Sequence, residues 1–276
     1  MKKVTVVLSG VGTPGFSTIA LMEFFDKHHI VPNTIVGCSS AAFVAGLWAK
    51  GYSPQESLAL VREVYSTTMK PQIDHYTSFF FFKAPKNKFD IHRALLKTDN
   101  IKRDYRSIFE NQLVENLPIK TYFHTTNINT GDSYLIKEGS ISQAVYAASA
   151  ILPFYPPIHI HNQWLAAGLY SESLPLRAIL NESSDIIIAT DISNEVQHKK
   201  ENFLSYYTNF VDKAFKAASM PYAALIYDLH SDEILIVPIK IEHQEFKDPM
   251  AALDYSIDFA RKNLQQKEDY ILSLLK

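Results

Sequence analysis

Cysteine is almost absent from this sequence, and it has neither a long apolar run nor an excess of one charge. The single cysteine among 276 residues, Cys38, excludes an internal disulfide and a metal site built on cysteines. No apolar run approaches the roughly 18 residues of a membrane-spanning helix, and the N-terminal run is too short for a signal peptide. The 27 basic and 29 acidic residues are interspersed, with a formal net charge of -2 and no electrostatic footprint for nucleic acid. We expect a globular, cytoplasmic protein that does not bind nucleic acid.

Alternating strand and helix patterns run through the chain. Continuous aliphatic runs predict buried strands, and helical spacing of apolar residues predicts the helices between them. We expect strands at 4–8, 34–36, 120–127, 134–136, 185–190 and 234–241, and helices at 17–28, 41–50, 142–149, from 54 and from about 249. No linker, repeat or charge block divides the chain, which favours a single domain that spans residues 1–276. The predicted fold class is α/β, a three-layer α/β/α sandwich with a mostly parallel sheet and helices on both faces.

A glycine-rich loop, Gly10-Val11-Gly12-Thr13-Pro14-Gly15, follows the first expected strand. Its glycine spacing is that of a dinucleotide-binding loop. That interpretation requires an acidic residue at the end of the second strand, where this chain has Gly37-Cys38. Pro14 also removes a backbone N–H that should face a phosphate. We interpret the segment instead as an oxyanion loop, in which the N–H groups of Val11 and Gly12 face a developing negative charge.

A candidate nucleophile follows the second expected strand, in the segment Gly37-Cys38-Ser39-Ser40-Ala41. This segment resembles a nucleophile elbow, with alanine in place of its last glycine. Small neighbours are needed because a serine on so sharp a turn crowds the residues two before and two after it. Taken alone, the pattern is more typical of a helix cap. We interpret Ser40 as that cap and Cys38 as a buried, unreactive thiol.

Five motifs, in the same order along the chain, resemble those of patatin-like acyl hydrolases. They are the segments 8–15, 19–21, 37–42 with 47–54, 126–131 and, as the most specific, 147–157 with the sequence AASAILPFYPP. The resemblance covers residues 4 to about 195. It implies a patatin-like fold that the helices and strand of 196–276 complete.

The resemblance also implies roles for individual residues. Ser39 would be the nucleophile of a Ser–Asp dyad, in an elbow that Gly37 and Ala41 keep narrow. The oxyanion hole would be formed by Gly10, Val11 and Gly12. Neither a metal nor an organic cofactor is implied.

The chain departs from the family pattern in two places. In the first loop, the family has a third glycine and a basic residue where this chain has Val11 and Pro14. The second departure concerns the base of the dyad. Where the family has the aspartate of the dyad, this chain has Ala167, followed by the expected Gly168. An alanine cannot accept the serine proton, so we expect the chain to be inactive or strongly impaired. Either Ala167 is native, or it replaces an aspartate of the natural protein; the otherwise retained motifs favour the second. Five residues could substitute as the base. Neither Glu172 nor Asp185 occupies the right position in the sequence. The histidines His124, His159 and His161 are more typical of hydrogen-bonded or surface histidines than of a base.

The function implied is that of a serine acyl hydrolase that cleaves fatty acyl esters of lipids, of the phospholipase A, lysophospholipase or esterase type. The alternatives are an acyltransferase or thioesterase for carrier-bound acyl groups, and a natural pseudoenzyme that binds acyl chains. The implied partners are a lipid or fatty acyl (thio)ester, with a membrane surface or an acyl carrier protein as its source. Residues 71–90 hold four consecutive phenylalanines and form either a buried crossover or a lid. Head group, chain length and oligomeric state stay open.

Overall fold

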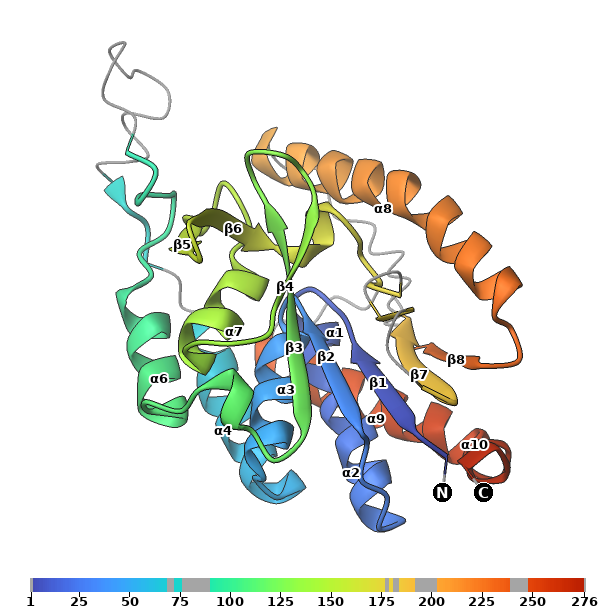
Figure 1. Ribbon diagram of the computed structural model, residues 1–276. Helices are drawn as coiled ribbons and strands as arrows, with labels where there is room; N and C mark the ends of the chain where they lie inside the picture. Colours follow the sequence, from blue (N-terminus) through green and yellow to red (C-terminus); the bar gives the residue numbers. More distant parts are fainter. Residues whose placement is uncertain are drawn as a thin grey trace.

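An eight-stranded sheet runs through the computed structural model (Figure 1). The structure describes residues 2–68, 72–75, 90–176, 179–180, 184–191, 203–238 and 248–275. The strands are β1 (Val4–Leu8), β2 (Thr34–Cys38), β3 (Lys120–Asn127), β4 (Ser133–Ile136), β5 (Ile158–Ile160), β6 (Gln163–Ala167), β7 (Ile186–Asp191) and β8 (Ile234–Pro238). Their order across the sheet is β5-β6-β3-β2-β1-β7-β8, and β4 also pairs with β3.

Most of the sheet is parallel, as the sequence predicts. Strands β3, β2, β1, β7 and β8 pair in parallel, whereas β4, β5 and β6 pair antiparallel at one side. All five residues of β1 are buried, which a strand covered on both faces requires. The neighbours of β1 are β2 on one side and β7 on the other, so the chain changes direction across the sheet at β1. Ligands of open α/β sheets bind at such a switch point, beyond the carboxyl ends of the strands.

Helices cover both faces of this sheet. They are α1 (Thr13–Ser17), α2 (Ile19–Lys27), α3 (Ala41–Lys50), α4 (Pro54–Thr68), α6 (Asp99–Phe109), α7 (Ile141–Ser149), α8 (Phe203–Leu229), α9 (Pro249–Gln266) and α10 (Glu268–Leu275), with 3₁₀ turns η1 (Val114–Asn116) and η2 (Gly168–Tyr170). Alternate residues of a strand face opposite sides. Val6 lies in a core with α2, α3, α7 and α9, whereas Val7 lies in a second core with Ile226 of α8. The fold is therefore a three-layer α/β/α sandwich.

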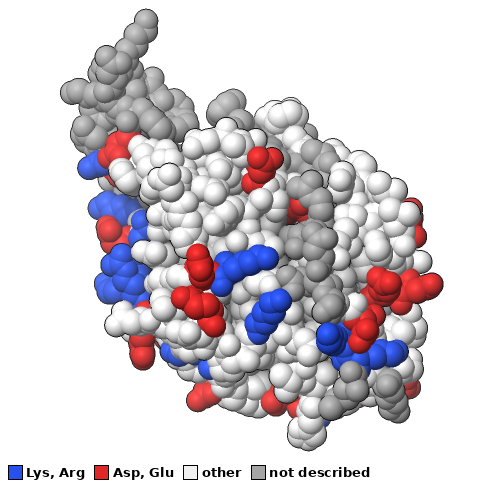
Figure 2. Space-filling view, viewed as in Figure 1, with Lys and Arg blue, Asp and Glu red and all other residues white. Residues whose placement is uncertain are grey.

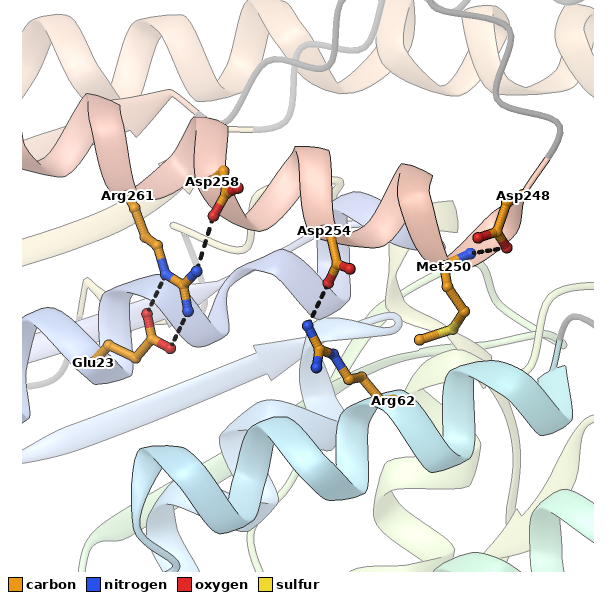
Figure 3. Close-up of polar contacts among 7 residues, drawn as sticks. All are labelled: Glu23, Arg62, Asp248, Met250, Asp254, Asp258 and Arg261. Carbon is orange, nitrogen blue, oxygen red and sulfur yellow. Dashed lines mark hydrogen bonds and ion pairs between the residues drawn. The ribbon is translucent and has the colours of Figure 1, made fainter.

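Helix α9, the penultimate helix of the chain, belongs to the same core as the first helices. It packs on α1 and α2 and buries one apolar side, formed by Leu253, Ile257, Ala260 and Leu264. Two arginines reinforce this contact (Figure 3). Arg261 donates to both carboxylate oxygens of Glu23 on α2, at 2.8 and 2.7 Å, and Arg62 on α4 donates to Asp254 at 2.6 Å.

Some element boundaries differ from those expected. The helix expected at 17–28 starts earlier, because Pro14 in the first turn of α1 favours a helical start. That helix is also broken at Thr18, between α1 and α2. The strand expected at 34–36 continues to Cys38, and the strand expected at 234–241 is described as far as Pro238. Helix α6 and the β5–β6 hairpin were not expected.

The surface carries its charges in a scattered arrangement. Figure 2 shows basic and acidic side chains interspersed on the face in view, whereas the surface over α8, at the upper right, is largely uncharged. Along α8 several large apolar side chains are exposed, among them Tyr206, Phe210, Tyr222 and Leu225. None of the helices in the described part of the chain is long and apolar enough to cross a membrane.

Candidate active site

The turn between β2 and α3 holds Ser39 in a conformation that few residues adopt. Its φ is 57°, in the left-handed region that is unfavourable for residues other than glycine. A Cβ atom at Gly37 would lie 2.7 Å from the Cα of Ala42 and 2.7 Å from the Cβ of Ala45. Ala41 is fully buried. The need for small neighbours, inferred from the sequence, thus has a direct steric cause.

The Ser39 side chain has no hydrogen-bond partner within the described part of the structure. The residue is 1% exposed, and its Oγ atom is buried. A buried hydroxyl without a partner is unfavourable, because it loses its bonds to water and gains none in return. A polar group of substrate or protein is therefore needed at this position to satisfy Ser39.

The loop after β1 packs directly on this turn. The N–H of Ser40 donates to the carbonyl of Gly10 at 3.0 Å, and the N–H of Gly12 donates to Ser40 Oγ at 2.9 Å. A Cβ at Gly15 would lie 2.3 Å from the Gly10 oxygen, so only glycine allows this approach. Ser40 stands at the N-cap of α3 but makes no side-chain capping bond. Its hydroxyl instead joins the loop to the elbow, which differs from the cap expected from the sequence.

Ala167 lies next to this turn because β2 and β6 share one edge of β3. In the strand register, Cys38 pairs with His124 of β3, and Ala167 pairs with the next residue, Thr125. Strand β4 pairs with both of these β3 residues, and therefore occupies the other edge. Since β2 runs parallel to β3 and β6 runs antiparallel to it, the carboxyl ends of β2 and β6 meet. Ala167 is fully buried there.

A buried histidine lies beneath this junction. His124 Nδ1 is 3.4 Å from Cys38 Sγ, and its Nε2 is 2.8 Å from Ser133 Oγ. A Cβ at Gly168 would lie 2.2 Å from His124 Nδ1, so residue 168 must be glycine. Burial raises the pKa of Cys38 to about 12, which keeps the thiol protonated. Cys38 is thus a buried thiol, as the sequence predicts, and this burial is the cause of its raised pKa.

The chain after Ala167 folds back over the same place. Within and after η2, the N–H groups of Ser171 and Glu172 both donate to the carbonyl of Gly168 at 3.1 Å. Cys38 Sγ donates to the carbonyl of Glu172 at 3.9 Å. Glu172 is 9% exposed, and its negative charge also raises the pKa of Cys38. The structure therefore brings Glu172 to the elbow, which spacing along the sequence did not indicate.

The other residues weighed as substitute bases lie elsewhere. Asp185 precedes β7 and accepts the backbone N–H of Lys3, which places it at the amino end of the strands. The ring of His159 packs on that of Trp164, with 5.1 Å between centroids, within the β5–β6 hairpin. His161 lies at the turn of this hairpin, between β5 and β6.

Two other expectations concern a metal and a lid. Among the described residues, no group of three or more His, Cys, Asp or Glu side chains is placed to hold a metal ion. The lid or crossover predicted at 71–90 lies outside the described residues, apart from 72–75 and 90.

Known proteins are similar to this chain in sequence. The family model of the patatin-like phospholipases matches residues 6–180. An uncharacterized NTE family protein of Mycobacterium tuberculosis is 25% identical over 187 residues, which are 68% of this chain and 30% of that protein. The lysophospholipase NTE1 of Scheffersomyces stipitis is 24% identical over 211 residues, 72% of this chain and 12% of that enzyme. The chain thus spans less than a third of the length of these relatives.

Solved structures resemble the chain only distantly. VipD of Legionella pneumophila has a TM-score of 0.46 and 11% identity, over 96% of this chain and 67% of VipD. ExoU in its complex with SpcU, from Pseudomonas aeruginosa, has a TM-score of 0.47 and 11% identity, over 96% of this chain and 52% of that chain.

Proposed function

The chain belongs to the patatin-like phospholipase family, and from that premise we propose that it cleaves fatty acyl esters of lipids with Ser39 as nucleophile. The observation that carries this proposal is the junction of β2 and β6. There the buried Ser39 hydroxyl, which has no hydrogen-bond partner among the described residues, adjoins Ala167, the position that the resemblance assigns to the aspartate.

The proposed reaction proceeds in two steps. Ser39 Oγ attacks the ester carbonyl while its proton passes to a base, and the leaving alcohol takes that proton as the acyl–Ser39 ester forms. Water then releases the fatty acid by the reverse sequence. The backbone N–H groups of Val11 and Gly12 stabilise the oxyanion, within the loop that starts at Gly10. Because the Gly12 N–H is bonded to Ser40 Oγ, it must exchange that acceptor for the substrate oxygen.

In this proposal, Ala167 limits the rate of ester hydrolysis. Its methyl group offers no lone pair to the Ser39 proton, so the chain is strongly impaired relative to a variant with aspartate there. Positioned general bases contribute on the order of 10²- to 10⁴-fold to such reactions. The glycine that follows this position in the family is present as Gly168. Steric contact with His124 requires glycine there, whether or not the site is catalytic.

The proposed substrates are fatty acyl esters of phospholipid, lysophospholipid or glyceride. The lysophospholipase activity in the name of one relative supports a lipid ester. The substrate would come from a membrane surface; a thioester on an acyl carrier protein is the alternative. Ala167 is also the specific observation in favour of a second candidate function, a pseudoenzyme that binds acyl chains without turnover.

The test is hydrolysis of a medium-chain p-nitrophenyl ester by three proteins. These are the chain itself, Ala167→Asp, and Ala167→Asp combined with Ser39→Ala. We expect slow or no turnover by the first, clear activity in the second and its loss in the third. If Ala167→Asp is inactive on esters, phospholipids and thioesters alike, the hydrolase proposal is wrong and the acyl-binding candidate takes its place.

A further inference from the structure

The backbone of an acidic residue, Glu172, lies at the elbow. Glu172 is 9% exposed, and its charge acts on Cys38, the residue directly before Ser39. The Oε1 atom of Glu172 is buried. Acidic residues are rarely buried unless the structure positions them.

The position of Glu172 is fixed by the backbone. The N–H of Glu172 donates to Gly168, and its carbonyl accepts from Cys38 Sγ, so both of its peptide groups are tied to the junction of β2 and β6. Ser171 adds a second tie, because its hydroxyl is 2.9 Å from Thr126 Oγ1 of β3. The Glu172 carbonyl contacts the thiol of Cys38, and Ser39 is the next residue, with its Cα about 3.8 Å from that of Cys38.

The remaining substitutes offer no comparable arrangement. Asp185 is at the opposite end of the strands, and His159 and His161 lie in the β5–β6 hairpin. His124 is close, but its two ring nitrogens already face Cys38 Sγ and Ser133 Oγ. Of the five residues weighed as bases, Glu172 alone combines a carboxylate with a place beside the elbow.

We propose that Glu172 accepts the Ser39 proton in this chain and so sustains a slow acyl hydrolase reaction without a carboxylate at position 167. This inference rests on the proposed function of Ser39. The Glu172 carboxylate rotates to the Ser39 hydroxyl, takes its proton as the Oγ–carbon bond forms, and returns that proton to the leaving alcohol as the ester C–O bond breaks. In the second step it takes a proton from water, which attacks the acyl carbon and releases Ser39 Oγ, to which the proton passes.

The experiment measures initial rates of p-nitrophenyl ester hydrolysis for Glu172→Gln and Ser39→Ala, each made in the present chain and in Ala167→Asp. We expect Glu172→Gln to lower the slow rate of the present chain on the order of 10-fold or more, toward that of Ser39→Ala. In the Ala167→Asp background the same change should alter the rate by less than about threefold, because aspartate then accepts the proton. Thermal unfolding of each variant checks the fold, and glutamine keeps the size of the side chain.

A purely structural role for Glu172 would give a different pattern. It would lower the rate equally in both backgrounds, and that result overturns the inference. So does a present chain no faster than its Ser39→Ala variant, even when Ala167→Asp is active and the proposed function stands. A pH profile gives a second readout: the acidic limb of kcat/KM in the present chain should vanish in Glu172→Gln and return in Glu172→Asp. If no variant hydrolyses any ester, the proposed function fails together with the inference.

Discussion

Cys38 and Ala167 pair with consecutive residues on one edge of β3, so the strand before the proposed nucleophile Ser39 and the strand that ends at the proposed base position meet at their carboxyl ends. Backbone pairing sets this relationship, and the side chain at 167 does not enter it. A change between a methyl group and a carboxylate at 167 would therefore alter the chemistry of the junction while its backbone geometry is maintained.

A carboxylate introduced at position 167 should lower stability as it raises the proposed activity. Ala167 is fully buried, and burial of a carboxylate with few partners is unfavourable. We expect Ala167→Asp to lose about 1–3 kcal/mol in free energy of unfolding. Ala167→Asn is the matched control, because it has the same shape and cannot act as a base. Urea unfolding should show a comparable loss for both variants, with activity in the aspartate variant alone; an unchanged stability of both would contradict the burial argument.

Ser39 should reduce the stability of the fold through its backbone. Since its φ is 57°, glycine at this position should relieve strain worth about 1 kcal/mol. Ser39→Ala removes the same hydroxyl but keeps the Cβ, and is therefore the control. We expect Ser39→Gly to melt a few degrees above Ser39→Ala in a thermal scan. Equal melting temperatures would mean that the turn is unstrained.

The contact between Gly168 and His124 should not tolerate a methyl group. A Cβ at residue 168 would lie 2.2 Å from His124 Nδ1 and 2.5 Å from the His124 carbonyl oxygen. We expect Gly168→Ala to cost about 3 kcal/mol, the upper range for overpacking. Gly46→Ala is the comparison: its Cβ would meet the Phe109 ring at 2.9 Å, a side chain that can shift, and alanine favours the helix there. Urea denaturation should show a much smaller loss for Gly46→Ala; equal losses would contradict the steric account.

Cys38 should make stability depend on pH in the alkaline range. Its pKa is raised from 9.0 to about 12 by burial, so the unfolded thiol ionises first as the pH rises. The contribution is complete below pH 9.0 and is lost between that pH and about 12, by up to about 1.4 kcal/mol per pH unit. We expect the free energy of unfolding to fall less steeply in Cys38→Ala than in the parent just above pH 9.0. Identical slopes would show that the thiol ionises equally in both states.

Arg261 should contribute to the stability of the fold because its guanidinium group donates two hydrogen bonds to one carboxylate. It binds both oxygens of Glu23, whereas Arg62 makes one bond to Asp254. Lysine cannot form two parallel bonds, so Arg261→Lys should lose more stability than Arg62→Lys. Both side chains are close to half exposed, and we expect no more than about 1 kcal/mol for the first change, less at high salt. Chemical denaturation at two salt concentrations measures this; a larger effect for Arg62→Lys would contradict it.

The elbow and the central strands could be predicted because their signals are local. Gly37 and Ala41 flank Ser39 within one turn, and the aliphatic runs of β1 and β7 identify buried strands without reference to the rest of the chain. The alternation of strand and helix patterns predicts the mostly parallel sheet. The resemblance to the family motifs points to position 167.

The position of Glu172 could not be predicted because it depends on a 3₁₀ turn and on strand pairing. It follows Ala167 by five residues, and the bonds of Ser171 and Glu172 to Gly168 fold the chain back toward the elbow. The bond from Gly12 to Ser40 Oγ was missed for a similar reason, since it joins two loops far apart in the sequence. The strands β5 and β6 are short and partly exposed, and a short hairpin of this kind has no clear apolar alternation.

The pairing of both β2 and β6 with β3 also has a consequence for how the protein is made. On the ribosome, the segment with Ser39 emerges long before Ala167, and contacts of such sequence separation form late in folding. A nascent chain can thus possess its nucleophile turn while the surface opposite that turn has not yet been synthesised. Assembly of the proposed site therefore reports completion of the sheet, and we expect incomplete chains to lack the proposed activity.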